Sequence, residues 1–230
     1  MKALVLRLDA PLLSFGSVIV DQHGFIDRFP RTSMLTGLLA NALGWHHTDF
    51  EKLEELQRRI IYAARWDVPP EELVDYHTVD LGQTKMREAG WTTRGTPEHR
   101  TGGPDAKFGI HQRYRHYWTD GLLTLVLGLR NELSPHPSIS DLYEALLRPA
   151  RPLFLGRKTC LPARPILDPQ MPVAKGENVL AILKQVPVWD RHGVPVEHSG
   201  EWMACWPGEL GTTPRSQVRS VYDIRDWANQ

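Results

Sequence analysis

Residues 122–129 read Leu-Leu-Thr-Leu-Val-Leu-Gly-Leu, an almost wholly apolar run that is typical of a strand at the centre of a sheet. The segment before it, Tyr114 to Trp118, also has strand character, and Asp120-Gly121 is a turn signal between the two. At the start of the chain, alternating apolar residues over Ala3 to Asp9 predict a further strand. Together these segments predict a sheet with a buried central strand.

Two helices are predicted from capping signals followed by apolar residues at helical spacing. Thr32 or Ser33 can cap the first helix, and Gly44 is placed to end it. Ser138 and Asp141 open the second helix, which lies after the central strand. One helix therefore precedes the central strand and one follows it.

The stretch between these helices predicts two more strands and an insertion. A short helix near residues 48–56 gives way to a strand near Ile60 to Trp66, and Pro69-Pro70 then breaks the chain. Leu73 to Val79 is predicted to pair back on the preceding strand as a hairpin. Residues 81–109 are rich in glycine and proline and are long for a structureless loop, so they are expected to be functional or disordered.

The predicted order is β, α, β, β, insertion, β, α, which matches an α+β fold of the ferredoxin-like or RRM-like kind. Helices would cover one face of its sheet, and the open face could hold RNA. Residues 1–150 are predicted to form this domain, with a thumb-like insertion at about 81–113, and residues 151–230 a glycine-rich loop and a β-rich region. In that last part, strands are predicted over Val179 to Val188, Met203 to Trp206 and Val218 to Tyr222.

Composition narrows the functional classes. No apolar run approaches the roughly 20 residues that cross a bilayer, and the first strand lacks the features of a signal peptide, so a cytoplasmic protein without membrane contact is expected. Cys160 and Cys205 are too few for a disulfide scaffold and lack zinc spacing, so both are expected to be ordinary thiols. The adjacent His46 and His47 diverge on a helix, and no metal or cofactor is expected.

Charge is balanced in total but unevenly distributed. The chain has 27 basic and 27 acidic side chains. Residues 51–80 hold eight acidic and four basic residues, residues 81–117 seven basic and three acidic, and residues 147–167 five basic and none acidic. The two basic zones are either solvated faces or the footprint of a nucleic acid.

Two segments combine cations with glycine in a way that suits phosphate. In the first, Gly156 is followed by Arg157 and Lys158, where a glycine backbone allows close approach and the cations supply charge-assisted donors. A basic turn without a ligand explains that segment as well. In the second, Arg28 and Arg31 lead into the first turn of a predicted helix, where unpaired N–H groups favour an anion; a helix cap with exposed arginines is the alternative.

Histidines and tyrosines gather around residues 111–117, beside two arginines. Such a set contains the acid, base and cation of metal-independent RNA cleavage. However, alternation along a strand sends His111 and His116 to opposite faces, and aromatic-basic mixtures more often line RNA than cut it. Asp75-Tyr76-His77-Thr78 is a further segment that either presents an exposed aromatic and an imidazole or has a structural role.

Taken together, these segments resemble the CasD family, the subunit of the type I-E CRISPR Cascade complex that holds the 5′ end of the guide RNA. The resemblance rests on five blocks that occur in order and span nearly the whole chain. They are Leu6-Arg7-Leu8 through Pro11 to Phe15-Gly16; Arg28 to Ser33 with Leu35 to Leu39 and Leu43-Gly44; Asp75 to Val79; Leu155 to Cys160; and Pro214-Arg215 with Arg219 to Tyr222.

This resemblance implies a subunit that binds the crRNA 5′ handle without cutting it, in a ribonucleoprotein of antiviral defence. The implied partners are crRNA, the Cascade backbone subunit (CasC), the large subunit (CasA) and, through the complex, target DNA. The thumb would wedge against the backbone subunit and kink the guide. The implied RNA contacts, which include residues of the Asp75–Thr78 segment and the insertion, are Gly16, Arg28, Arg31, Ser33, Tyr76, His77, Arg94, Lys107, Arg113, Gly156, Arg157, Lys158 and Arg219.

Two other functions stay open at this point. The related type I-C subunit processes its guide precursor with a Tyr, Lys and His set, so the runner-up is an endoribonuclease using Tyr114, His111 or His116 with Lys107. A third reading is a structural subunit that binds only protein, which predicts no affinity for free handle RNA.

Overall fold

The computed structural model describes residues 1–80, 90–91, 97–98, 110–130, 136–197, 200–219 and 225–228. The chain divides into two units. Unit 1 consists of Met1–Gly16, Ile26–Leu73 and Tyr117–Gln230, and unit 2 of Ser17–Phe25 and Val74–His116.

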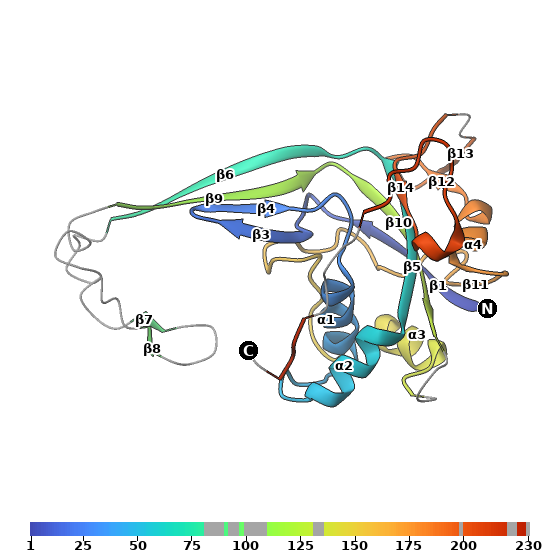
Figure 1. Ribbon diagram of the computed structural model, residues 1–230, viewed down its shortest axis with the longest axis horizontal. Helices are drawn as coiled ribbons and strands as arrows, with labels where there is room; N and C mark the ends of the chain where they lie inside the picture. Colours follow the sequence, from blue (N-terminus) through green and yellow to red (C-terminus); the bar gives the residue numbers. More distant parts are fainter. Residues whose placement is uncertain are drawn as a thin grey trace. The chain divides into compact units, whose positions relative to one another are not determined.

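Unit 1 is built on a five-stranded sheet whose central strand is the apolar run of residues 122–129. This strand, β10 (Leu122–Leu129), is buried at every residue, because it has a strand on each side and is covered on both faces. Neighbouring strands are antiparallel (Figure 1). The order across the sheet is β11 (Val173–Lys175), β1 (Lys2–Asp9), β10, β5 (Ile60–Val68) and β14 (Ala204–Cys205).

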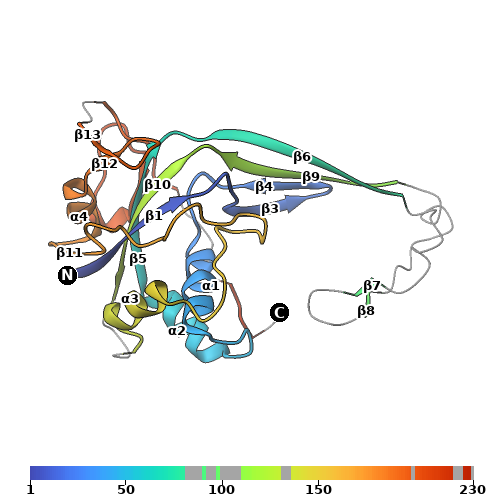
Figure 2. The same ribbon diagram turned by 180° about the vertical axis from the view of Figure 1, so that it is seen from behind.

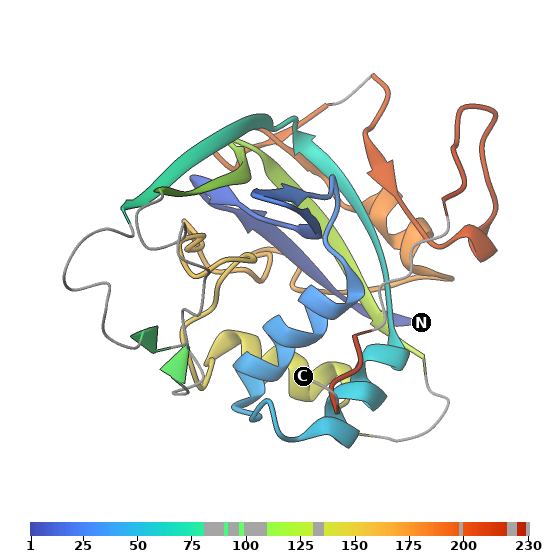
Figure 3. The same cartoon turned by 60° about the vertical axis from the view of Figure 1, so that its left-hand side comes forward.

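The helices complete the ferredoxin-like order. Helices α1 (Thr32–Leu43) and α2 (Phe50–Arg59) connect β1 to β5, and α3 (Ile139–Leu147) connects β10 to β11. They lie together on one side of the sheet (Figure 3) and pack their leucines on β1 and β10. The predicted α+β, ferredoxin-like class is therefore confirmed.

Helix ends follow the predicted signals with small shifts. Gly44 ends α1 with φ of +77°, a left-handed conformation that favours glycine. The predicted Ser138–Asp141 capping box is present at the start of α3. The N-cap residue of α1 is Arg31, one position before the predicted caps, and it makes no side-chain capping bond.

The second face of this sheet is covered, so the prediction of an open face for RNA is wrong. Helix α4 (Val179–Gln185) lies against β10 and β5 (Figure 2), and its Val179 and Ile182 share a buried cluster with Ala63 of β5 and Val126 of β10. The strand predicted over 179–188 is also wrong, because most of this segment forms α4. Its buried residues recur at helical spacing, and Asn178 caps the first turn by accepting from the N–H of Ala181 at 2.8 Å.

Beside α4, the same face holds a buried cluster of ion pairs centred on Asp67. Its carboxylate accepts from Arg7 Nη1 and from Arg65 Nε, both at 2.7 Å. Arg7 also donates from Nε to Asp168 at 2.8 Å, and Asp67 accepts from the N–H of Trp189 at 2.8 Å. Burial lowers the pKa of Arg7, and its bonds to Asp168 and Asp67 oppose that shift. The cluster joins β1 and β5 to the segment that covers them.

Unit 2 contains parts of four strands. They are β3 (Gly16–Val20), β4 (His23–Ile26), β6 (Glu71–Asp80) and β9 (Ile110–Thr119). In this unit β4 runs parallel to β9, with His23 opposite Tyr114, and β6 also pairs with β9. The predicted hairpin between residues 60–66 and 73–79 is thus wrong, because both edges of β5 are occupied by β10 and β14.

Short elements account for the rest of the described chain. The Asp120-Gly121 turn is present, with Asp120 at a φ of +55°, but it leads from β9 into a different sheet. Of the strand predicted over 218–222, residues 220–222 lie outside the described residues. The short elements are β2 (Leu12–Leu13), β7 (Gly90–Trp91), β8 (Pro97–Glu98), β12 (Val188–Trp189), β13 (Pro195–Val196) and the 3-10 helix Gly208–Leu210.

The Asp67 cluster predicts a large stability effect. Replacing Asp67 with Ala leaves two guanidinium groups buried without their shared carboxylate, which costs about 3–5 kcal/mol of the free energy of unfolding in urea titrations. The control is Glu54→Ala, which breaks an exposed pair with Arg58 and costs about 0.5 kcal/mol or less. Equal losses in the two variants would contradict a central role for Asp67.

The capping box predicts a pH dependence. The N–H of Ser138 donates to Asp141, and this bond is the main cause that lowers the pKa of Asp141 to about 2. Because the folded-state pKa lies below the unfolded one, the ionised form favours folding above pH about 4, and this contribution is lost as the pH falls towards 2. Wild type should therefore be more stable than Asp141→Asn at pH 6, and the difference in unfolding midpoint should shrink towards pH 2.

Candidate nucleic-acid interface

The predicted glycine-cation loop is a closed turn fixed at both ends. The N–H of Leu155 donates to the carbonyl of Cys160 at 2.8 Å, and the N–H of Cys160 donates to that of Arg157 at 2.9 Å. Leu155 and Cys160 are fully buried in the core of unit 1, whereas Lys158 is exposed. The core thus holds the loop while its cations stay at the surface.

Gly156 makes a close approach to the protein's own backbone. Its φ is +107°, and a side chain at this position would place its Cβ atom inside the carbonyl group of Ser14. The N–H of Ser14 in turn donates to the carbonyl of Leu155 at 3.0 Å. Glycine is therefore required at position 156 to pack two segments together, whether or not a ligand is bound. The sequence pattern alone indicates only a close approach to phosphate.

Arg157 is oriented by an aromatic ring. Its guanidinium carbon lies 4.8 Å from the ring centroid of Tyr117, a residue that is only 2% exposed. A cation held over a buried ring keeps its planar donors in a fixed position while part of the side chain stays accessible. Tyr117 is thus a supporting residue, although the sequence pattern had placed it in a possible catalytic group.

A second group of cations surrounds Asp27, a residue that sequence reasoning did not select. Arg31 donates from Nε to the Asp27 carboxylate, and Arg219 Nη1 lies 3.9 Å from the same carboxylate. The Arg28 side chain is exposed, and its carbonyl accepts from Trp66 Nε1 at 3.1 Å. Asp27 lies before α1, so the helical i, i+4 rule does not apply to Asp27 and Arg31, and no local sequence pattern indicates this pair.

Backbone contacts bring the two groups together within unit 1. Ser14 contacts the loop at Leu155, and the adjacent Phe15 accepts from the N–H of Asp27 at 2.6 Å. Gly16, next in the chain, is exposed, and even a Cβ atom added to it would have no neighbour within 4 Å, so its backbone is accessible. We call the resulting surface the cation seat; it consists of Gly16, Arg28, Arg31, Gly156, Arg157, Lys158 and Arg219.

Charge in the cation seat is strongly positive. Five of its seven residues are cations, and the carboxylate of Asp27 lies among them. Ser33 is partly buried in the first turn of α1, beside the seat. Two other arginines of the basic zone serve the fold instead: Arg151 donates to the carbonyls of Trp45 and Gly44 at the end of α1, and Arg164 pairs with Asp9 at 2.7 Å.

Three of the remaining predicted RNA contacts lie in unit 2. Tyr76 is 50% exposed, and His77 Nε2 lies 2.6 Å from Asp75 Oδ2. Arg113 is exposed and donates from Nη1 to the carbonyl of Asp21 at 3.1 Å. The predicted contacts Arg94 and Lys107 lie outside the described residues.

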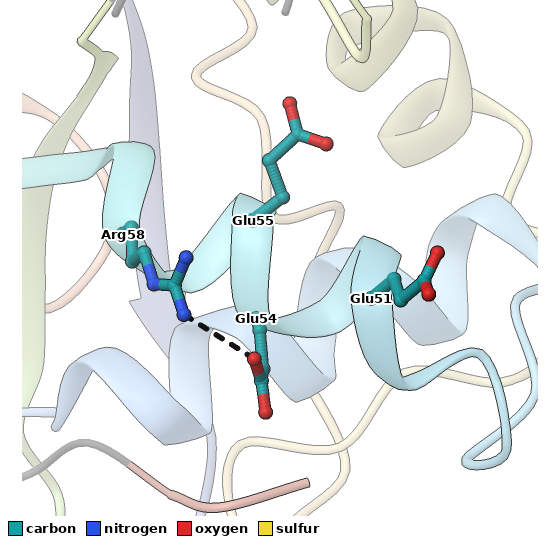
Figure 4. A pocket seen from close by; sticks show the side chains of 4 residues that line it. All are labelled: Glu51, Glu54, Glu55 and Arg58. Atoms are coloured by element: carbon teal, nitrogen blue, oxygen red, sulfur yellow. Dashed lines mark hydrogen bonds and ion pairs between the residues drawn. The ribbon is translucent and has the colours of Figure 1, made fainter. Parts of the chain in front are cut away.

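The surface of α2 has the opposite charge character. Figure 4 shows a pocket lined by Glu51, Glu54, Glu55 and Arg58, in which Arg58 pairs with Glu54 at 3.3 Å. Three carboxylates against one cation repel phosphate, so this hollow does not extend the cation seat.

The described residues offer little metal or thiol chemistry. Among them, no three His, Cys, Asp or Glu side chains are close enough to hold a metal ion. Both cysteines are free, and burial raises the pKa of Cys160 and raises that of Cys205 to about 12, so both thiols stay protonated and unreactive. No helix in the described part of the chain is long and apolar enough to cross a membrane.

Comparison with known proteins places these features in a family. The model of the family described as CRISPR-associated protein (Cas_Cas5) matches residues 3–230. The CRISPR system Cascade subunit CasD of Escherichia coli (strain K12) is 32% identical, over 76% of this chain and 77% of that protein.

The fold has a counterpart among solved structures. A chain of a CRISPR RNA-guided surveillance complex superposes with a TM-score of 0.57 at 24% identity, and the match covers 86% of this chain and 73% of that one. This likeness agrees with the ferredoxin-like order of the main sheet. Because the family model spans nearly the whole chain and the Escherichia coli relative is similar over most of its length, the chain belongs to the Cas5 family of CRISPR-associated proteins.

Proposed function

We propose that this protein is the non-catalytic crRNA-binding subunit of a type I-E CRISPR Cascade complex, which grips the 5′ handle of the guide in antiviral defence. The observation that carries the proposal is the cation seat, which brings five cations and the exposed Gly16 together in unit 1. The similarity of the chain to the Cascade subunit CasD of Escherichia coli supports the same function.

The seat suits a short single strand for electrostatic reasons. Arg157 and Lys158 neutralise phosphates from one side, and Arg28 and Arg31 do so from the other. Each neutralised phosphate releases counterions, so affinity from such contacts falls as the salt concentration rises. The exposed backbone at Gly16 allows the strand to approach closely.

Partners follow from the same proposal. The seat binds the crRNA handle, and the insertion at about 81–113 is the thumb that contacts the backbone subunit (CasC), so that the protein caps the filament of that subunit. The large subunit (CasA) is a neighbour, and target DNA is met only through the complex. The complex acts in the cytoplasm.

Geometry argues against the endoribonuclease alternative. His116 is only 8% exposed, and its Nε2 lies 3.4 Å from Nδ1 of His23. Tyr114, the proposed partner in catalysis, stacks on the same His23 ring at 4.6 Å. A general acid or base must reach the scissile phosphate, and a largely buried imidazole beside a second imidazole is poorly placed for that. Lys107 lies outside the described residues, as does the side chain of His111.

The cation seat predicts a change in both affinity and salt dependence. The double variant Arg157→Ala/Lys158→Ala should bind handle RNA more weakly, and its slope of log affinity against log salt should fall by about 0.7 for each lost phosphate contact. Fluorescence anisotropy over a salt series measures both quantities.

The matched control removes two cations from the acidic surface of α2. Lys52→Ala/Arg58→Ala alters net charge equally but should leave affinity and slope close to wild type. An unchanged slope in the Arg157/Lys158 variant would refute the cation seat as the phosphate-binding surface.

The non-catalytic assignment predicts that purified protein leaves its repeat RNA intact in the absence of metal. Denaturing gels after prolonged incubation test this, with His116→Ala as the companion variant. Defined cleavage upstream of the handle by wild type, abolished in His116→Ala, would establish the endoribonuclease instead.

A further inference from the structure

Unit 2 carries a continuous row of stacked rings. His23 lies between Tyr114, at 4.6 Å with an interplanar angle of 7°, and Phe25, at 5.5 Å and 12°. Tyr76 extends the row beyond Tyr114 at 4.9 Å and 31°. His116 packs beside this row, and the centroid of its ring lies 4.8 Å from that of Phe25. We call this row, made of Tyr76, Tyr114, His23 and Phe25, the ring stack.

The strands explain why these rings meet. His23 and Tyr114 are directly opposite in the parallel pair of β4 and β9. Side chains two positions apart share a face of a strand, so Phe25 joins His23, and His116 joins Tyr114. Tyr76 comes from β6, on the other side of β9. Three strands thus place their rings on one face of this sheet.

The stack ends in an accessible ring. Tyr76 is 50% exposed, although one side of its ring rests against Tyr114. Part of the Tyr76 side chain is therefore accessible to solvent. A row of contacting rings that ends in an exposed ring is an arrangement that a planar ligand can extend by stacking.

The chemistry of the surroundings fits a nucleobase. The rings are phenols, an imidazole and a phenyl group, and every base has a π-face that can stack on such rings, with a strength that differs modestly between bases. Arg113 and Arg115 are exposed in the same strand, but each is one position from Tyr114, so alternation places their side chains on the other face of this sheet, and the contact with the stack would come from the rings.

We propose that the ring stack of unit 2 is a seat for one unpaired base of single-stranded RNA, which stacks on the exposed ring of Tyr76. This inference rests on the proposed function, because it assigns a second contact of the same RNA. It differs in kind, since the cation seat of unit 1 binds phosphates and the ring stack binds a base.

The test compares two RNAs that have the same backbone charge but different stacking strength. Full-length protein is titrated into fluorescein-labelled oligoadenylate and oligouridylate of equal length. Tyr76→Leu keeps an apolar side chain but removes the ring. Its affinity for oligoadenylate should be about 5-fold or more below that of wild type, which is the lower end of the range for one base–aromatic stack. Its salt slope should stay at the wild-type value, because no phosphate contact is lost.

Two further variants isolate the ring. Tyr76→Phe retains the stacking face and should bind like wild type. Val79→Ala alters a residue of the same strand that is 43% exposed, but its odd spacing from Tyr76 places it on the other face, so it should also bind like wild type.

The outcomes separate this inference from the proposed function. If Tyr76→Leu binds both RNAs like wild type while Arg157→Ala/Lys158→Ala still weakens both, the ring stack is not a base-binding site and the cation seat stands. If Tyr76→Leu instead loses binding to another Cascade protein but not to RNA, the stack is a protein contact and the inference is overturned. If wild type binds neither RNA, the proposed function itself fails.

Discussion

The fold of unit 1 depends on the buried carboxylate of Asp67. It accepts from guanidinium groups on two strands, Arg7 of β1 and Arg65 of β5, and from the N–H of Trp189 in the segment beyond them. Buried charges are tolerated only when each is paired and hydrogen-bonded, so these groups fix the positions of the strands and of the covering segment together. The cluster therefore occupies the second face of the sheet and joins it to the segment that covers it.

Because the second face is covered, a ligand of unit 1 must bind elsewhere. A ferredoxin-like sheet with an open face offers that face to single-stranded RNA, but here α4 and the Asp67 cluster occupy it. The residues of the cation seat lie instead on turns and loops and around the start of α1. The proposed binding surface is thus formed by connections that the sheet and helices hold in place, which is where function commonly lies.

The sequence indicates the class of fold well, because its signals are local. The apolar run 122–129, the Ser138–Asp141 box and the helix stop at Gly44 all depend on near neighbours in the chain, and each is present in the structure. The covering of the second face and the partners of β6 depend on residues far apart, so strand pattern alone could not supply them. The same holds for Asp27, whose importance becomes visible only when Phe15 and Arg219 are brought beside it.

The close contact of Gly156 with Ser14 has a consequence for how tightly such a protein can hold its ligand. Since the two backbones touch, the distance between the loop and the neighbouring segment is set during folding and has no room to adjust afterwards. Groups that are already immobile lose little conformational entropy when a ligand arrives, so more of each contact's energy contributes to affinity. A methyl group at this one position would restore that freedom, and the loop would have to become ordered anew at each encounter.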